Sequence, residues 1–140
     1  MLEASQELKA FMAYPTDRKY TKEHEWIRVN GASATVGITD YAQESLGDIV
    51  FVEVPKVGAE LSVGKTFGTV ESVKAVSDLF APVSGTVTAV NEDLNASPEQ
   101  VNKDAHKAWM VKDTLKDPKQ ASDLLSAGEY EKFVAEEGGH

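Results

Sequence analysis

From residue 48 to residue 94, short runs of strand-forming residues alternate with turn residues. These runs cover residues 49–54, 66–73, 75–81 and 86–90, with glycines or prolines between most of them. Short runs that are rich in β-branched residues and bounded by glycine and proline are typical of strands. The pattern therefore predicts a β-rich core, and a chain of 140 residues is long enough to bury such a core in one domain.

The segment before this core predicts a hairpin followed by a short helix. Residues 25–38 alternate in polarity around Asn30-Gly31, and an Asn-Gly step is a strong hairpin signal. The Thr-Asp pair that follows can cap a helix that runs to residue 46. Gly47 is expected to end that helix, because glycine adopts left-handed backbone angles without strain.

Helices are expected mainly toward the two ends of the chain. In order, the sequence predicts an amphipathic helix within residues 1–16, a capping box at 97–100, a closing strand at 109–111, a helix from 117 to 125 and a final helix after Ser126. A capping box pairs a serine or threonine with a glutamate or glutamine three residues later, and the two side chains bond reciprocally to the backbone. Tyr130, Phe133 and Val134 are expected on one apolar face of the final helix.

The composition disfavours several classes of function. The chain has no cysteine, which excludes disulfides, thiolate metal sites and cysteine nucleophiles. Its formal net charge of −9 and its pI of about 4.8 oppose binding to nucleic acid and to anionic membranes. No apolar run reaches the length of a membrane-spanning helix. An acidic surface of this kind instead suits basic protein partners.

Lys74 stands at the centre of the strand pattern. It is the only lysine between Thr66 and Asn102, and it separates the strand-like runs 66–73 and 75–81. This arrangement predicts a lysine at the tip of a hairpin, presented by two short, firm strands. The ε-amine of lysine can be acylated to carry a long swinging arm. A lysine that is simply solvated would show the same pattern.

The remaining motifs do not assemble a catalytic or metal site. Gly64 and Lys65 suggest a phosphate-binding loop, but that motif needs a glycine at the position of Ala59 and a helix after it. The histidines are scattered and lack the spacing of zinc ligands; they are His24, His106 and His140. No nucleophile elbow and no dinucleotide-binding fingerprint is present. We therefore expect no catalytic residue and no metal.

Several linked motifs resemble those of the glycine cleavage system H protein family. In chain order, they are RKYTKEHEW at 18–26, GITDYAQ at 37–43, LGDIVFV at 46–52, ESVKAVSDL at 71–79 and APVSG at 81–85. The resemblance covers roughly residues 18 to 134 in one continuous order. It implies a mainly β fold, a flattened β-barrel or barrel-sandwich hybrid like that of lipoyl domains. Short helices, including a C-terminal helical extension, would complete that fold.

The resemblance implies a carrier and not an enzyme. Its domain would span residues 18–140, after an N-terminal extension over 1–17, and Lys74 matches the lysine that carries lipoate in amide linkage. In the family, the lipoyl group takes the aminomethyl group of glycine from a pyridoxal-phosphate-dependent decarboxylase, the P protein. It delivers that group to a tetrahydrofolate-dependent aminomethyltransferase, the T protein. Dihydrolipoamide dehydrogenase, the L protein, then reoxidises the dithiol.

Further expectations about partners follow from the same resemblance. A lipoyltransferase or lipoate ligase would attach lipoate, and the carrier would act as a monomer without nucleic acid or membrane. The lack of cysteine fits this role, because thiols on the chain would exchange with the lipoyl sulfurs.

The resemblance also implies roles for three carboxylates. Glu25 and Asp78 are the candidates for a cleft that holds the ammonium of the aminomethyl arm through charge-assisted hydrogen bonds. Glu71 is expected to serve recognition by the lipoylating enzyme. Two features depart from the family pattern: Glu23 occupies a position where some members have serine, and residues 103–108 form a shortened segment without glycine.

Localisation and the competing functions stay open at this point. Residues 1–14 contain two glutamates and no arginine, so they are neither a signal peptide nor an intact organelle presequence. The ending from 133 to 140 resembles plant-type members, which implies the mitochondrial matrix after presequence removal; bacterial cytoplasm is the alternative. The alternative functions are a lipoyl domain that relays lipoate or serves a 2-oxoacid dehydrogenase complex, and an unmodified docking module.

Overall fold

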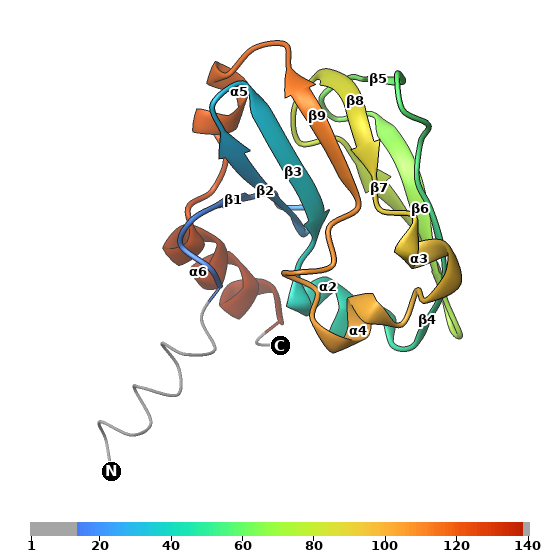
Figure 1. Ribbon diagram of the computed structural model, residues 1–140. Helices are drawn as coiled ribbons and strands as arrows, with labels where there is room; N and C mark the ends of the chain where they lie inside the picture. Colours follow the sequence, from blue (N-terminus) through green and yellow to red (C-terminus); the bar gives the residue numbers. More distant parts are fainter. Residues whose placement is uncertain (1–13, 139–140) are drawn as a thin grey trace.

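The computed structural model describes residues 14–138 and shows two antiparallel sheets, with helices between and after their strands (Figure 1). The larger sheet has the order β1-β2-β3-β9-β8-β5, and the smaller has the order β4-β6-β7. The strands of the larger sheet are β1 Lys19–Tyr20, β2 Glu25–Asn30, β3 Ser33–Ile38, β5 Glu60–Leu61, β8 Gly85–Val90 and β9 Val111–Leu115. Those of the smaller sheet are β4 Ile49–Glu53, β6 Thr66–Ser72 and β7 Val76–Phe80.

The helices lie between and after the strands along the chain. They are α2 Asp40–Leu46, α3 Asp93–Ala96, α4 Gln100–Lys103, α5 Lys119–Ser122 and α6 Ala127–Gly138. The arrangement confirms the expected mainly β barrel-sandwich hybrid with a C-terminal helical extension. Most of the N-terminal segment for which a helix was expected lies outside the described residues, and residues 14–17 are not helical.

The hairpin and helix predicted over residues 25–47 are confirmed. β2 and β3 pair antiparallel from Glu25–Ile38 to Asn30–Ser33, and Gly31 supplies the left-handed turn with a φ of 65°. The Oγ1 of Thr39 accepts a hydrogen bond from the Ala42 N–H and caps α2. Gly47 ends this helix with a φ of 82°, a conformation that a residue with a side chain adopts only with strain.

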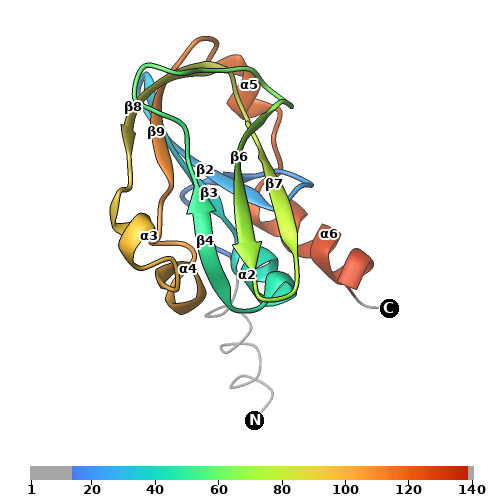
Figure 2. The same ribbon diagram turned by 90° about the vertical axis from the view of Figure 1, so that its right-hand side faces the viewer.

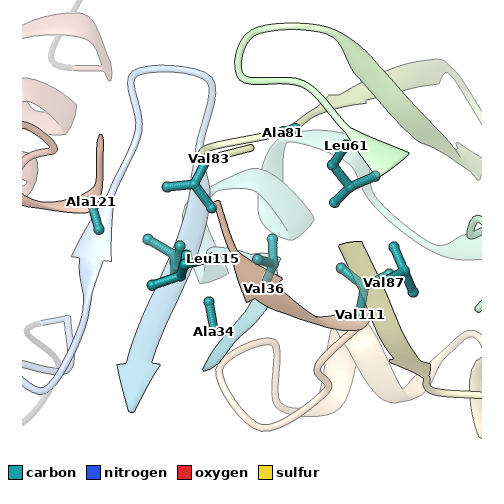
Figure 3. Packing of buried hydrophobic residues seen from close by; sticks show 10 residues of the cluster. Ala34, Val36, Leu61, Ala81, Val83, Val87, Val111, Leu115 and Ala121 are labelled. Carbon is teal, nitrogen blue, oxygen red and sulfur yellow. The ribbon is translucent and has the colours of Figure 1, made fainter. Parts of the chain in front are cut away.

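The apolar core lies between the two sheets. Figure 3 shows one of its clusters, in which Leu61, Ala81 and Val83 pack with Val36 and Val111. A second cluster joins the smaller sheet to α3 and α4, and the partly buried Val54 and Phe67 contact both clusters. The sheets are therefore held together by continuous apolar packing, which fixes the smaller sheet against the larger one.

The final helix has the expected cap and buried face. The Glu129 N–H donates to Ser126 Oγ, and the Ser126 N–H donates to Glu129 Oε1, which makes a reciprocal capping box. Tyr130 is fully buried, and Phe133 and Val134 pack around it as partly buried neighbours. In Figure 1, α6 lies beside β1 and β2.

Three local predictions were wrong in extent. The strand expected at 109–111 begins only at Val111 and runs to Leu115, because this segment pairs with both β3 and β8. The helix expected from 117 to 125 is limited to α5, because the N–H and C=O of Leu125 pair instead with Tyr20. No side-chain capping box forms at 97–100, since the Ser97 carbonyl, and not its hydroxyl, accepts from the Gln100 N–H.

Candidate functional site

Lys74 is exposed in the turn that joins β6 to β7, as the sequence predicted. Figure 2 shows this turn at the end of the smaller sheet, beside α2. The valines on either side are also exposed, at 70% for Val73 and 68% for Val76. The tip therefore presents an accessible amine between apolar side chains.

Ser72 holds the backbone of this turn. Its hydroxyl oxygen accepts hydrogen bonds from the N–H groups of Lys74, at 3.3 Å, and Ala75, at 3.0 Å. The Ser72 N–H donates to the Ala75 carbonyl at 2.8 Å. The turn is therefore closed by backbone and side chain together, while the lysine side chain stays free. Ser72 was not among the site residues predicted from the sequence, although a serine two residues before the lysine is a recognisable turn signal.

The tip also rests on the segment that links α2 to β4. The Val73 N–H donates to the Asp48 carbonyl at 3.0 Å. The Cε of Lys74 lies 3.6 Å from the point where a Cβ on Gly47 would stand. Gly47 thus gives the lysine stem a shallow surface to lie on at the end of α2.

A cleft of about 290 Å³ opens next to this surface. Its lining comes from the segment before β2, from α2, from β7 and from α6, and consists of Glu23, His24, Tyr41, Ala42, Ser45, Leu46, Ser77 and Glu137. Leu46 lines the cleft and directly precedes Gly47, over which the Lys74 stem lies. A flexible arm on the lysine would therefore have a short route along the end of α2 into the cleft.

His24 organises one wall of the cleft. It has a φ of 72°, the left-handed region that costs energy for a non-glycine residue. Its Nδ1 lies 2.7 Å from the Tyr130 hydroxyl and its Nε2 lies 3.0 Å from Glu137 Oε1. The Tyr130 hydroxyl lies 2.7 Å from the Thr39 hydroxyl, which caps α2. The His24 ring is therefore held by α6, and Tyr130 links α6 to the cap of α2. No group of three potential metal ligands occurs within residues 14–138.

Glu25 points into the protein and is only 2% exposed. One carboxylate oxygen accepts from the Thr21 hydroxyl at 2.6 Å, and the other accepts from the Phe80 N–H at 3.1 Å. Burial raises the pKa of Glu25 to about 7, although both hydrogen bonds act in the opposite direction. The carboxyl group therefore joins the start of β2 to the end of β7.

The structure does not place Glu25 and Asp78 together in the lining of the cleft. Asp78 is exposed on β7, opposite Thr69 of β6, whereas the cleft is lined on this strand by Ser77. Glu71 is exposed on β6, where the registers place it between Phe51 on β4 and Val76 on β7. Glu23, which the sequence analysis did not assign to the cleft, is among its lining residues.

The segment at residues 103–108 is anchored to the larger sheet. The Trp26 indole N–H donates to the Ala105 carbonyl at 3.1 Å. The Arg18 guanidinium donates to the His106 carbonyl at 2.8 Å and stacks over the Trp26 ring at 4.5 Å. These contacts give the segment a defined conformation next to β2.

Comparisons with known proteins agree with one another. The family model described as glycine cleavage H-protein matches residues 18–137. The glycine cleavage system H proteins of Koribacter versatilis and Acidobacterium capsulatum are 69% and 65% identical over 129 residues, which is 92% of this chain and all of each relative. The crystal structure of a glycine cleavage system H protein from Mycobacterium marinum has a TM-score of 0.78 and 39% identity. The match covers 89% of this chain and 99% of the Mycobacterium marinum chain.

Proposed function

Since the chain belongs to the glycine cleavage H-protein family, we propose that it is the lipoyl-bearing shuttle of a glycine cleavage system. Members of this family are non-catalytic carriers, so the chain is a carrier and not an enzyme. In this proposal, lipoate bound to Lys74 supplies the disulfide chemistry that takes up the aminomethyl group of glycine. The observation that carries the proposal is the exposed Lys74 on a turn closed by Ser72, beside a cleft that an arm can reach.

The residues around Lys74 fit a covalently attached arm. The amine is exposed, which an attaching enzyme requires, and the backbone beneath it is fixed by Ser72 and Asp48. A fixed attachment point with a mobile stem confines the arm to the volume around the tip, which raises its effective concentration at the cleft. The cleft has a volume of about 290 Å³ and is lined by residues of α2, β7 and α6, so it can take up part of such an arm.

Two carboxylates, Glu25 and Asp78, are proposed to stabilise the arm's ammonium group: Asp78 by contact, and the buried Glu25 only through the strand that it holds. The support from the structure is indirect, because Glu25 holds the Phe80 N–H and so fixes the strand that carries Asp78. Replacing Asp78 with alanine is expected to shorten the lifetime of the aminomethyl-loaded protein while lipoylation continues. An unchanged lifetime would remove Asp78 from this role and leave Glu23 to be tested next.

The proposed partners are the P, T and L proteins and a lipoate ligase or lipoyltransferase. The family assignment supports these partners, and the net charge of −9 suits basic docking surfaces. Glu71 is proposed to contact the lipoylating enzyme, since it is exposed between Phe51 and Val76 on the outer face of the smaller sheet. The chain is proposed to act as a monomer.

The proposed location is the bacterial cytoplasm. The relatives named above are bacterial, which supports this alternative and gives no support to the mitochondrial matrix inferred from the ending of the chain. Within residues 14–138, no helix is both long enough and apolar enough to span a bilayer.

The proposal is tested by measuring the intact mass of the protein after incubation with lipoate, ATP and a lipoate ligase. Lys74→Arg is the matched control, because it keeps the positive charge and removes the acylable amine. We expect the increment of one lipoyl group on the wild-type protein and none on the variant. No increment on the wild type, under conditions that modify another H protein, would favour an unmodified docking module.

A further inference from the structure

The side-chain amide of Asn102, on α4, bonds to residues of α2, of the link that follows it and of the start of β4. Its Nδ2 donates to the Gly47 carbonyl at 2.9 Å and to Gln43 Oε1 at 2.8 Å. Its Oδ1 accepts from the Ile49 N–H at 2.9 Å. Both amide hydrogens and the carbonyl oxygen are therefore engaged, and two of the partners are backbone groups on either side of Asp48.

The residue clamped in this way is the one that supports the lysine turn. Asp48 lies between the two backbone partners of Asn102, and its carbonyl accepts the Val73 N–H at 3.0 Å. Gly47, whose carbonyl Asn102 binds, lies under the Lys74 stem. A continuous set of contacts thus runs from α4 through residues 47–49 to the hairpin tip.

Asn102 is well suited to act at a distance from the amine. Gly47 has a φ of 82°, and a glycine in this conformation has more backbone freedom than any other residue when its contacts are lost. The Asn102 amide binds the backbone on both sides of Asp48, so it supplies fixed bonds that select one conformation of residues 47–49. A residue of the hairpin itself would restrict only the turn, whereas Asn102 fixes the turn relative to the rest of the protein.

We propose that Asn102 is a positioning residue for Lys74: it holds residues 47–49 so that the hairpin tip is presented in one orientation to the lipoylating enzyme. This inference rests on the proposed function, because it assigns the orientation a role in modification. An ordered tip loses less conformational freedom when it docks, so the benefit is expected in KM rather than in kcat. Asn102 does not touch the amine and is no part of the chemistry.

The test compares Asn102→Ala with Asn91→Ala in the full-length chain. Asn91 is a matched control, since its side chain also bonds to backbone groups, the Trp109 carbonyl and the Asp93 N–H, away from the hairpin. The first readout is hydrogen exchange of the Val73 amide relative to that of Met110, whose N–H donates to Val36 inside the larger sheet. The second is the KM and kcat for lipoylation by lipoate ligase.

For Asn102→Ala, we expect the Val73 amide to exchange about tenfold faster and the KM for lipoylation to rise about fivefold, with kcat nearly unchanged. Asn91→Ala is expected to leave both readouts within about twofold of the wild type. Gln43→Ala removes one of the bonds and is expected to have a smaller effect in the same direction. Asn102→Asp keeps the acceptor for Ile49 and loses both donors, so it provides a second variant if alanine prevents folding.

The inference is overturned if Val73 exchange and KM in Asn102→Ala and Asn102→Asp stay within about twofold of the wild type. It is also overturned if Asn91→Ala raises KM equally, since the effect would then reflect general destabilisation. If the wild type is not lipoylated at all, the proposed function fails. Val73 exchange then still decides whether Asn102 orders the tip.

Discussion

Asp113 is expected to weaken the fold, and replacing it with leucine is expected to stabilise the protein. The residue lies on β9 and is only 1% exposed, on the side of the strand that carries the core residues Val111 and Leu115. Neither carboxylate oxygen has a hydrogen-bond partner. Leucine has a similar branched shape and would extend the apolar face of the strand, so the substitution removes a buried unpaired charge without leaving a cavity.

The size of the effect follows from the pKa of Asp113, which burial raises from 3.8 to about 6. At 1.36 kcal/mol per pH unit, this corresponds to about 3 kcal/mol for ionising the group in the folded state. The folded protein binds the proton more tightly than the unfolded chain does. The contribution of Asp113 to stability is therefore most favourable below about pH 4, falls as the pH rises to about 6, and does not fall further above that value.

The assay is urea unfolding of the wild type, Asp113→Leu and Asp113→Asn at several pH values from 4 to 8. At pH 8, we expect the free energy of unfolding of Asp113→Leu to exceed that of the wild type by about 3 kcal/mol or more. Asp113→Asn keeps the size and polarity of the side chain and removes the charge. The free energy of unfolding of this variant relative to the wild type should therefore increase between pH 4 and 6. The reasoning is refuted if leucine destabilises the protein at pH 8, or if the difference between asparagine and aspartate does not depend on pH.

Three further substitutions test other parts of the structure. Glu25→Gln keeps an acceptor for the Phe80 N–H and removes the charge. Because burial raises the pKa of Glu25 from 4.5 to about 7, the free energy of unfolding of this variant, measured in urea, should rise above that of the wild type between those pH values, by at most about 3 kcal/mol. Gly68→Ala would place a Cβ against the Glu53 carbonyl oxygen, and a loss of more than about 2 kcal/mol is expected, whereas unchanged stability would mean that β4 and β6 can separate freely. Ser126→Ala removes the cap of α6 and should cost about 1 kcal/mol, measured by thermal unfolding; no loss would show that the capping box contributes nothing.

Features that depend on neighbouring residues were predictable from the sequence. The Asn30-Gly31 step fixes the β2–β3 hairpin, and the Ser126–Glu129 box begins α6, because each signal is complete within a few residues. The hairpin around Lys74 was predictable for the same reason. The attached group and its partners, in contrast, came from the resemblance to a family, since no residue pattern specifies lipoate.

Features that depend on distant pairing were not predictable. Leu125 leaves the helix to pair with Tyr20, and β1 and β5 are too short to form without a neighbouring strand. Asp113 interrupts the alternation of β9, so the strand seemed to end at Val111. The role of Asn102 depends on contacts with residues more than fifty positions away, and an asparagine in isolation gives no sign of them.

The central claim is that the chain shuttles a one-carbon unit on Lys74, and a reconstituted glycine cleavage reaction tests it most directly. The lipoylated protein is combined with P, T and L proteins, glycine and tetrahydrofolate, and the release of ammonia is measured. We predict glycine-dependent ammonia release with the lipoylated wild type, and none with Lys74→Arg or with the unmodified chain. Equal release with Lys74→Arg, or none with the lipoylated wild type where another H protein supports the reaction, would contradict the account.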